Sequence, residues 1–293
     1  MTSHRHSIQA VLVLYRRKPS QSEAFVSLNN IFLLHPPLAQ SISVLLYDNS
    51  PDPLADASEI PSGMDYVHDP HNGGLLAAYT HALHLAKATH KHWLMLLDQD
   101  TQVTYEYLSE ALNLTTSATH DNRIAAIIPR LVEQGRCTSP STRQLIRDRP
   151  LPNDTSGLVD ITVCAFNSGA IIRVAALQRI GGFPEEFPIE SLDHAVFHLL
   201  QQNGDKVFIM QSILEHALSM NNIAESMSLD RYRKVLAAEA LFTRKYGGTW
   251  AQIRMRIRLL LLLRKQLRRK HEWPFTLATL YYALWYRPSQ SFR

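Results

Sequence analysis

Short apolar runs alternate with helical patterns over the first two-thirds of this 293-residue chain, and this alternation constrains its fold more than any other feature. Each run has the length of a buried strand. The four clearest runs are IQAVLVLY (8–15), SISVLLYDNS (41–50), MDYVHD (64–69) and HWLMLLD (92–98). Alternation of strands with helices is typical of a mostly parallel sheet that has helices on both faces. We therefore predict an α/β fold built on such a sheet.

Two helices are predicted between these strands, at residues 23–34 and 75–88. The second has apolar residues at three- and four-residue steps, namely Leu76, Tyr79, Leu83 and Ala86. Residues 133–160 are rich in Ser, Thr, Pro and Arg, and we predict a long irregular loop there. A late strand is predicted at 205–210, and a helical tail begins near Leu229.

The composition is that of a globular protein, because 45% of the residues are hydrophobic and only 19% are charged. Cys137 and Cys164 form no CxxC pair, which excludes a disulfide framework and a cysteine zinc site. Residues 1–17 lack the long apolar core and the cleavage site of a secretory signal. No run has the roughly 20 apolar residues that span a bilayer. We expect a cytoplasmic protein.

The net charge of +4 hides a strong asymmetry along the chain. Residues 228–293 hold 15 Lys and Arg against 3 Asp and Glu, a net charge of +12, so the remainder carries −8. An acidic body with a basic tail favours two separate roles. It argues against a nucleic-acid-binding protein, in which the basic charge would cover the fold itself.

Two aspartates stand where the strand at 92–98 ends, in the sequence LLDQDT. Asp98 and Asp100 flank a single glutamine, and paired carboxylates at a strand end suit Mg²⁺ or Mn²⁺. The same pair can also form an acidic turn without any ligand. The spacing alone leaves both interpretations open.

Polar and glycine-rich turns follow two other strands. Asp48, Asn49 and Ser50 can form an Asx-type turn, or Asp48 can accept a hydrogen bond from a nucleobase, because ligands bind at the carboxyl ends of parallel strands. Residues 72–74 (Asn-Gly-Gly) precede a helix, where free backbone N–H groups can face an anion. A plain loop-to-helix joint explains these glycines equally well.

A fourth acid, Asp193, starts the predicted helix in FPEEFPIESLDHAVFHLL (183–200). It can cap this helix, or it can act as a general base opposite the metal site. The glycines of NSGA (167–170) and GGF (181–183) more often serve turns. Spacing does not choose between these alternatives.

Five segments, taken in order, resemble glycosyltransferase family 2, which has the GT-A fold. They are AVLVLY, LLYDNS, NGGLLAAYTHALHLA, LLDQDT and FNSGAIIRVAALQRIGGF. The later motifs SGAIIR and GGFPEEFPIESLD resemble the bacterial rhamnosyltransferase-like branch. The resemblance covers roughly residues 8–220 and implies a Rossmann-like sandwich around a mostly parallel central sheet.

The resemblance implies roles for residues on the donor side of the site. Asp48 matches the acid that reads the nucleotide base, and Asn72 with Gly74 matches the turn that lines the nucleotide site. Asp98 and Asp100 match the motif that holds the metal and the diphosphate, with Asp100 as the direct ligand of Mg²⁺ or Mn²⁺.

Two further roles follow from the resemblance. Asp193 matches the acid that serves as the catalytic base. His216, in LEHAL, resembles a late histidine near the nucleotide or the metal, and a packed structural histidine is the alternative. The branch often has a second acid and an aromatic residue after the position of Asp193, whereas Ala195 and Val196 stand here. Asp193 therefore works alone, Glu190 assists it, or the acceptor differs from the usual one. The first strand ends in Tyr-Arg-Arg, where many relatives have Tyr-Asn.

The basic tail has an amphipathic pattern. Ile253, Ile257, Leu260 and Leu267 are predicted to line one side of a helix, with Arg254, Arg258, Lys265 and Arg269 on a neighbouring face. Trp and Tyr residues at 273–286 suit the headgroup region of a bilayer. An interfacial anchor on anionic lipid and a helix that packs on the body or in a homodimer are both consistent with this pattern.

The resulting prediction is an inverting glycosyltransferase of bacterial cell-surface polysaccharide synthesis, peripheral on the inner face of the plasma membrane. Its donor is a nucleotide-diphosphate sugar, with dTDP-rhamnose as one candidate, and its acceptor is a saccharide or a lipid-linked saccharide. The catalytic domain spans residues 1–222, with a nucleotide-sugar half at about 1–100 and an acceptor half at about 101–222, and a helical extension follows at 223–293. The alternative is an inactive GT-A relative that acts as a membrane scaffold.

Overall fold

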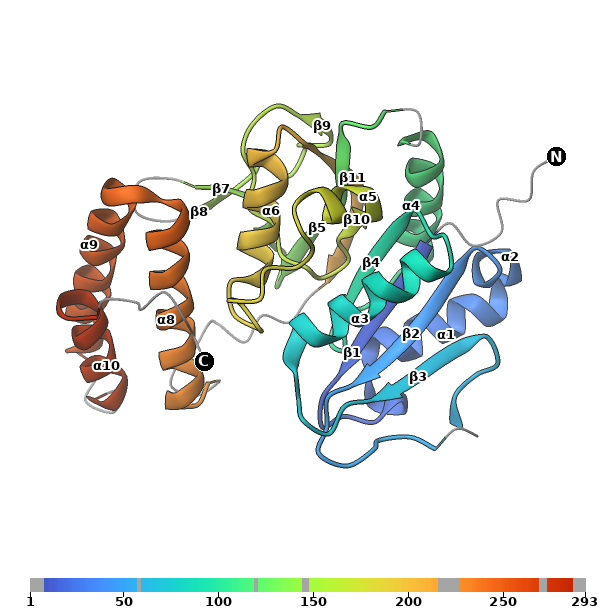
Figure 1. Ribbon diagram of the computed structural model, residues 1–293, viewed down its shortest axis with the longest axis horizontal. Helices are drawn as coiled ribbons and strands as arrows, with labels where there is room; N and C mark the ends of the chain where they lie inside the picture. The colour runs from blue at the N-terminus through green and yellow to red at the C-terminus, as the bar shows by residue number, and fades with distance from the viewer. Residues whose placement is uncertain are drawn as a thin grey trace. The chain divides into compact units, whose positions relative to one another are not determined.

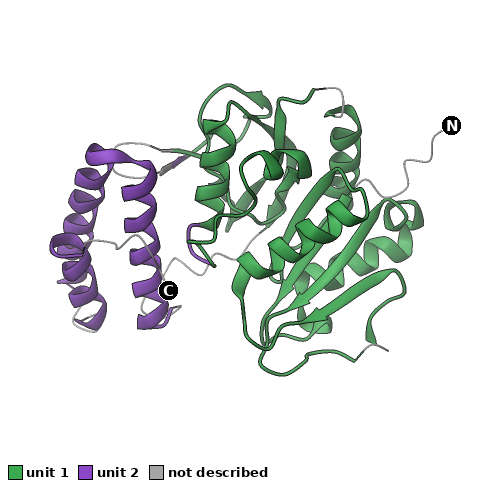
Figure 2. Cartoon of the chain, in the orientation of Figure 1, with its two compact units in different colours: residues 1–142, 150–188, 192–217 green, residues 143–149, 189–191, 218–293 purple. Residues whose placement is uncertain are grey.

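The computed structural model describes residues 8–56, 59–118, 121–143, 148–215, 227–268 and 273–286. The chain divides into two compact units (Figure 2). Unit 1 comprises residues 1–142, 150–188 and 192–217, and unit 2 comprises 143–149, 189–191 and 218–293.

A nine-stranded sheet forms the centre of unit 1 (Figure 1). Its order is β3 (Met64–His68), β2 (Ile42–Asp48), β1 (Ile8–Leu14), β4 (Trp93–Asp98), β10 (Ile171–Arg173), β5 (Ile124–Glu133), β11 (Lys206–Glu215) and β9 (Gly157–Val159), with β6 (Arg136–Ser139) paired to β5. Neighbours from β3 to β4 are parallel, as are β5 and β11, whereas β10, β9 and β6 are antiparallel to their partners. The predicted α/β fold with a mostly parallel sheet is confirmed.

Helices cover both faces of this sheet, which explains why all seven residues of β1 are buried. Alternate β1 residues, from Ile8 to Leu14, pack in one core cluster with α1 (Glu23–Leu34) and α4 (Tyr105–Ser117). Because side chains alternate along a strand, Val11 and Val13 face the opposite side. There α3 (Gly74–Ala88) packs on β1 and β4, with α5 (Val174–Arg179) beside it.

Most predicted elements of unit 1 are present, with two corrections. The segment 133–160 is not one irregular loop, because it contains β6, β9 and a two-stranded sheet of β7 (Ser141–Arg143) and β8 (Asp148–Pro150). These strands are only three or four residues long and lack an apolar pattern, so the sequence does not reveal them. The late strand β11 continues to Glu215, five residues past its predicted end, because its pairing with β5 resumes at Ile213 after a register shift.

The described residues of unit 2 include three helices, α8 (Leu229–Tyr246), α9 (Gly248–Gln266) and α10 (Trp273–Leu284). They share a small core that includes Leu236, Met255 and Tyr282. Within it, the hydroxyls of Tyr232 and Thr279 are hydrogen bonded at 2.7 Å, and Gln266 Nε2 donates to Tyr232 Oη at 3.2 Å. Among the described residues, none of the helices combines the length and the apolar character needed to cross a bilayer.

Candidate active site

The ends of three neighbouring strands bring two of the predicted acids to one edge of the sheet. Leu14, the last residue of β1, pairs with Asp48 of β2, and Val13 pairs with Asp98 of β4. Asp48 and Asp98 are therefore separated by the single strand β1, at the carboxyl ends where ligands bind in sheets of this kind.

The carboxylate of Asp48 is fully buried and shapes the loop that follows β2. Its Oδ1 accepts a hydrogen bond from Ser50 N at 2.9 Å, and its Oδ2 accepts from Leu54 N at 2.9 Å and from the Tyr66 hydroxyl at 2.6 Å. Burial and the bond to Asp48 raise the pKa of Tyr66 to about 12. Asp48 therefore holds the loop at 49–54 closed, as the Asx-type interpretation predicts.

Asp48→Asn is expected to lower the free energy of unfolding by about 1–3 kcal/mol, because an amide NH₂ would face N–H and O–H donors inside a buried site. The midpoint of urea unfolding measures this loss. Tyr66→Phe is the matched control, since it removes one of the three hydrogen bonds without placing a donor there, and its loss should be smaller. An unchanged midpoint for Asp48→Asn would show that this network does not stabilise the loop.

The turn that precedes α3 is fixed by a second carboxylate, Asp69. It accepts hydrogen bonds from His71 N and Gly73 N, both at 3.0 Å, and these bonds lower the pKa of Asp69 against the opposing effect of burial. Asn72 is exposed and has a φ of 51°, and Gly74, the first residue of α3, has a φ of 71° that favours glycine. The predicted nucleotide-site turn is thus tightly formed.

Asn49 joins this turn to the end of β2. Its Nδ2 donates to the carbonyl oxygen of Gly74 at 3.2 Å. Its Oδ1 is buried and has no hydrogen-bond partner among the described residues. Asp48 and Gly74 belong to separate motifs in the sequence. The structure brings them together through Asn49, which follows Asp48 and bonds to Gly74.

Asp98 is half-buried and contacts two hydroxyl groups. The hydroxyl of Ser168 donates to its Oδ2, and the hydroxyl of Tyr79, from α3, lies 3.5 Å from its Oδ1. Ser168 and Tyr79 are themselves buried. The orientation of the Asp98 carboxylate is therefore set by side chains from two other segments.

The segment around Ser168 runs antiparallel beside β4 and continues the pairing of β10 with that strand. Gly169 N donates to Leu96 O at 2.8 Å, and the Tyr107 hydroxyl donates to Gly169 O at 2.7 Å. Gly169 has a φ of 73°, and a Cβ at this position would lie 2.7 Å from Leu214 Cδ1 and 2.9 Å from Pro129 Cγ. Only glycine fits here, and its backbone conformation carries Ser168 to Asp98.

Asp193 lies in the first turn of α6 (Leu192–Gln202) and is half-buried. Because it is the second residue of the helix, it is not the N-cap, and its Oδ1 accepts from His194 N at 2.7 Å. Burial raises the pKa of Tyr79 well above its ordinary value, and the charges of Asp98 and Asp193 raise it further. Both carboxylates therefore act on one buried hydroxyl.

The approach of α6 to this edge is supported by backbone contacts. Pro188 O accepts from Leu76 N in the first turn of α3 at 3.0 Å, which fastens the segment before α6 to that helix. Glu190, the acid that could assist Asp193, forms an ion pair of 3.1 Å with Arg231. The Glu190 carboxylate therefore has a charged partner, the guanidinium of Arg231.

Asp100 is half-buried in the turn after β4. Gln99 ties this turn to β1, because its Oε1 accepts from Tyr15 N at 2.9 Å. Gln102 N donates to Glu215 O at 3.4 Å, so the end of β11 lies beside the turn. His216, the next residue in the sequence, lies outside the described residues. Among the residues that are described, no three His, Cys, Asp or Glu side chains gather in a metal-binding cluster.

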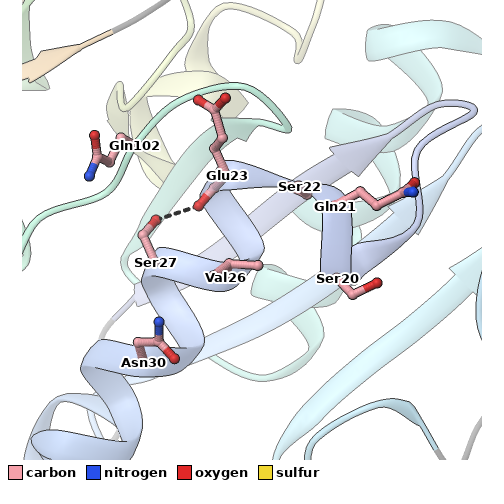
Figure 3. Close-up of a pocket in the computed structure, with 8 residues that line it drawn as sticks. All are labelled: Ser20, Gln21, Ser22, Glu23, Val26, Ser27, Asn30 and Gln102. Atoms are coloured by element: carbon pink, nitrogen blue, oxygen red, sulfur yellow. Dashed lines mark hydrogen bonds between the residues drawn. The ribbon is translucent and has the colours of Figure 1, made fainter.

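A polar pocket of about 460 Å³ lies between the start of α1 and the turn after Asp100. Figure 3 shows Glu23, Ser27 and Asn30 of α1 on one side of it, with Gln102 from the other segment opposite them. None of the predicted acids lines this pocket. It is an open depression beside the strand ends and does not hold the candidate chemistry.

Sequence reasoning missed the role of Tyr79 and Ser168. Tyr79 appears in the sequence as one of the apolar residues on the buried face of a helix, and nothing in that pattern shows where its hydroxyl lies. Ser168 stands in a motif whose glycine was expected to serve a turn. A hydroxyl residue directly before a glycine in this motif is the one signal in the sequence that could have indicated the contact between Ser168 and Asp98.

The comparisons with known proteins concern the family and the fold. Residues 46–181 match the family described as glycosyl transferase family 2. The crystal structure of S. aureus TarS 1–349 in complex with UDP-GlcNAc is 14% identical, with a TM-score of 0.55 over 94% of this chain and 79% of that chain. The complex of the same protein with UDP is 14% identical, with a TM-score of 0.51 over 94% and 80%. No curated protein matches the chain. At this identity the structural similarity is one of fold.

Proposed function

We propose that this chain, a GT-A glycosyltransferase with a family 2 segment at residues 46–181, moves a sugar from a nucleotide-diphosphate donor to a saccharide or a lipid-linked saccharide. The proposal is supported by the surroundings of Tyr79: its buried hydroxyl lies 3.5 Å from Asp98 Oδ1, and burial raises its pKa, with the charges of Asp98 and Asp193 adding to this effect. A site for inverting transfer needs one group for the leaving diphosphate and another for the incoming hydroxyl, and we assign these two roles to the acids after β4 and to Asp193.

The residues at the end of β4 fit a divalent cation that is shared with a substrate. Mg²⁺ is commonly bound by one or two carboxylates and completes its shell with water and phosphate oxygens, so a cluster of three protein ligands is not required. Asp100 would hold the ion, with help from Asp98 and from His216. A cation held there would supply positive charge to neutralise the departing diphosphate.

In this proposal, the role of Asp98 depends on the fixed orientation of its carboxylate. Ser168 and Tyr79 direct its two oxygens, so the carboxylate is orientated before any ligand arrives. A preorganised group costs little reorganisation when charge develops during the reaction. Asn72 and Gly74, at the start of α3, would face the nucleotide and its diphosphate.

Asp193 takes the role of general base. An acceptor hydroxyl approaches the sugar on the face opposite to the diphosphate, and Asp193 accepts its proton as the new glycosidic bond forms. The result is a single displacement with inversion. Glu190, which forms an ion pair with Arg231, is the second candidate for this task.

The donor is a pyrimidine nucleotide-diphosphate sugar, either a UDP-sugar of the kind bound in the TarS crystal structure or dTDP-rhamnose. Asp48 would accept a hydrogen bond from the base when the loop at 49–54 opens. The product is a bacterial cell-surface polysaccharide, and the chain, alone or as a homodimer, works at an anionic membrane on the inner face of the plasma membrane. The alternative is an inactive relative that acts as a scaffold there.

A thermal-shift screen of UDP- and dTDP-sugars, with and without Mn²⁺, tests the proposal. A ligand that binds the native state at 100 times its Kd stabilises it by RT ln(1 + [L]/Kd), which should raise the Tm by about 5–10 °C. The rise should need both the sugar nucleotide and Mn²⁺, and the same mixture should then show slow donor hydrolysis. A scaffold without a donor site would give neither result with any sugar nucleotide.

A further inference from the structure

The helices of unit 2 differ in what they expose. α9 packs on the core of unit 2 through Ala251, Met255 and Leu259. The side of α9 predicted to be apolar is a different one, and Ile253, Ile257, Leu260 and Leu267 on it are between 43% and 57% exposed. The helix therefore has a second apolar stripe in addition to the one that builds the core.

This stripe, named here the α9 stripe, consists of Trp250, Ile253, Ile257 and Leu260. The residues recur at three- and four-residue steps and so lie on one side of the helix. Trp250 at its start is 83% exposed. α10 has a corresponding stripe, whose residues are Trp273, Leu277, Tyr281 and Leu284, followed by Trp285. All of them are at least 44% exposed.

The exposed face of α8 can be compared with those of α9 and α10. Its exposed residues are charged, among them Asp230, Arg233 and Lys234, and it has no exposed large hydrophobic residue. An ordinary surface helix of this unit thus has a polar outer face. The apolar outer faces of α9 and α10 are larger than the scattered exposed residues that a monomer tolerates without a reason.

Charge decides which occupant fits these stripes. α9 contains Arg254, Arg256, Arg258, Arg264 and Lys265 and no acidic residue. Arg258 pairs with Glu239 of α8, whereas Arg256 and Arg264 are exposed and pair with no carboxylate that the structure describes. A second copy would bring the same cationic helix against itself in a symmetric contact, which like charges oppose.

The geometry points to an anionic lipid surface as the partner of the α9 and α10 stripes. Aliphatic and indole side chains would enter the boundary between headgroups and acyl chains, and Arg256 and Arg264 would meet lipid phosphates. The inference rests on the proposed membrane location and names the residues that make the contact. It requires no donor, acceptor or metal ion.

Sedimentation of the full chain with vesicles tests this inference, using phosphatidylcholine alone or mixed with phosphatidylglycerol. Binding should need phosphatidylglycerol and weaken as salt is raised. Ile253→Ser with Ile257→Ser should reduce partitioning at least about tenfold, since two half-exposed aliphatic side chains would leave the lipid boundary. Leu33→Ser with Leu34→Ser is the matched control, because these residues are 72% and 76% exposed on unit 1.

A charge series completes the test. Arg256→Ala with Arg264→Ala should weaken binding about fivefold for each charge removed. Arg233→Ala with Lys234→Ala removes the same charge from α8 and should change binding less. Equal binding to both vesicle types, or equal loss in the α8 and α9 variants, would overturn the inference. A dimer in light scattering that dissociates on Ile253→Ser with Ile257→Ser would also overturn it, in favour of a second copy.

The lipid-binding inference and the transferase proposal can be rejected independently of each other. The α9 variants should retain donor-dependent thermal stabilisation, because no α9 residue has a place in the catalytic site. Loss of vesicle binding with an unchanged donor response would confirm the role of the stripe. A chain that binds no sugar nucleotide but sediments with phosphatidylglycerol would reject the transferase proposal and leave the lipid surface standing.

Discussion

Asp193→Asn is expected to reduce sugar transfer by about 10²–10⁴-fold while donor binding stays within a fewfold of the original, because general base catalysis contributes a factor of that size. The amide has nearly the shape of the carboxylate but cannot accept the proton of the acceptor hydroxyl. The donor contacts assigned to Asp48, Gly74 and Asp100 remain. The signature is a lower kcat with an unchanged Mn²⁺-dependent thermal shift from the sugar nucleotide.

Glu185→Gln is the matched control for this change, since Glu185 is an exposed carboxylate in the segment before α6. It removes the same charge a short distance along the chain and should leave transfer unchanged. If Asp193→Asn kept substantial transfer, the base would be another group. Glu190→Gln would then be the next variant, and it should also weaken the contact with Arg231.

The fold could be predicted from the sequence because its signals are local. Each of β1, β2 and β4 is an apolar run, and α1 begins at the predicted residue, where Ser22 accepts a hydrogen bond from Phe25 N. Short strands such as β9 could not be predicted, because three residues are too few to show the alternation of apolar and polar residues. β10 could not be predicted either, because its two partner strands, β4 and β5, are distant from it in the sequence.

The candidate site was predictable in its acids and not in the groups that orientate them. Asp48, Asp98 and Asp193 each end a strand or begin a helix, a position that motif reading can find. Ser168 reaches Asp98 because Gly169, beside β4, fits between Leu214 and Pro129 without a side chain, which is a property of three-dimensional packing. In the same way, helical periodicity identifies an apolar side of α9 but cannot show that the core uses another.

Asp100→Ala is expected to abolish the Mn²⁺-dependent part of donor binding and to lower transfer by about 10³-fold, because a cation that neutralises the diphosphate contributes several kcal/mol to the transition state. Thermal shift with the sugar nucleotide should become the same with and without Mn²⁺. Asp65→Ala, which removes an exposed carboxylate from β3, is the control and should keep the metal dependence.

The same measurement separates Asp100 from Asp98. Asp98 is held by the hydroxyls of Ser168 and Tyr79, so Asp98→Ala leaves two buried hydroxyls without their acceptor and should lower the Tm of the ligand-free protein. Ser168→Ala should weaken donor binding less than Asp100→Ala, because it loosens an orientating contact and leaves the cation ligand in place. An Asp100→Ala protein that still needs Mn²⁺ to bind the donor would move the metal site away from the end of β4. Since Asp100 is the only carboxylate of the LLDQDT turn besides Asp98, the cation would then have to be held by residues outside this motif.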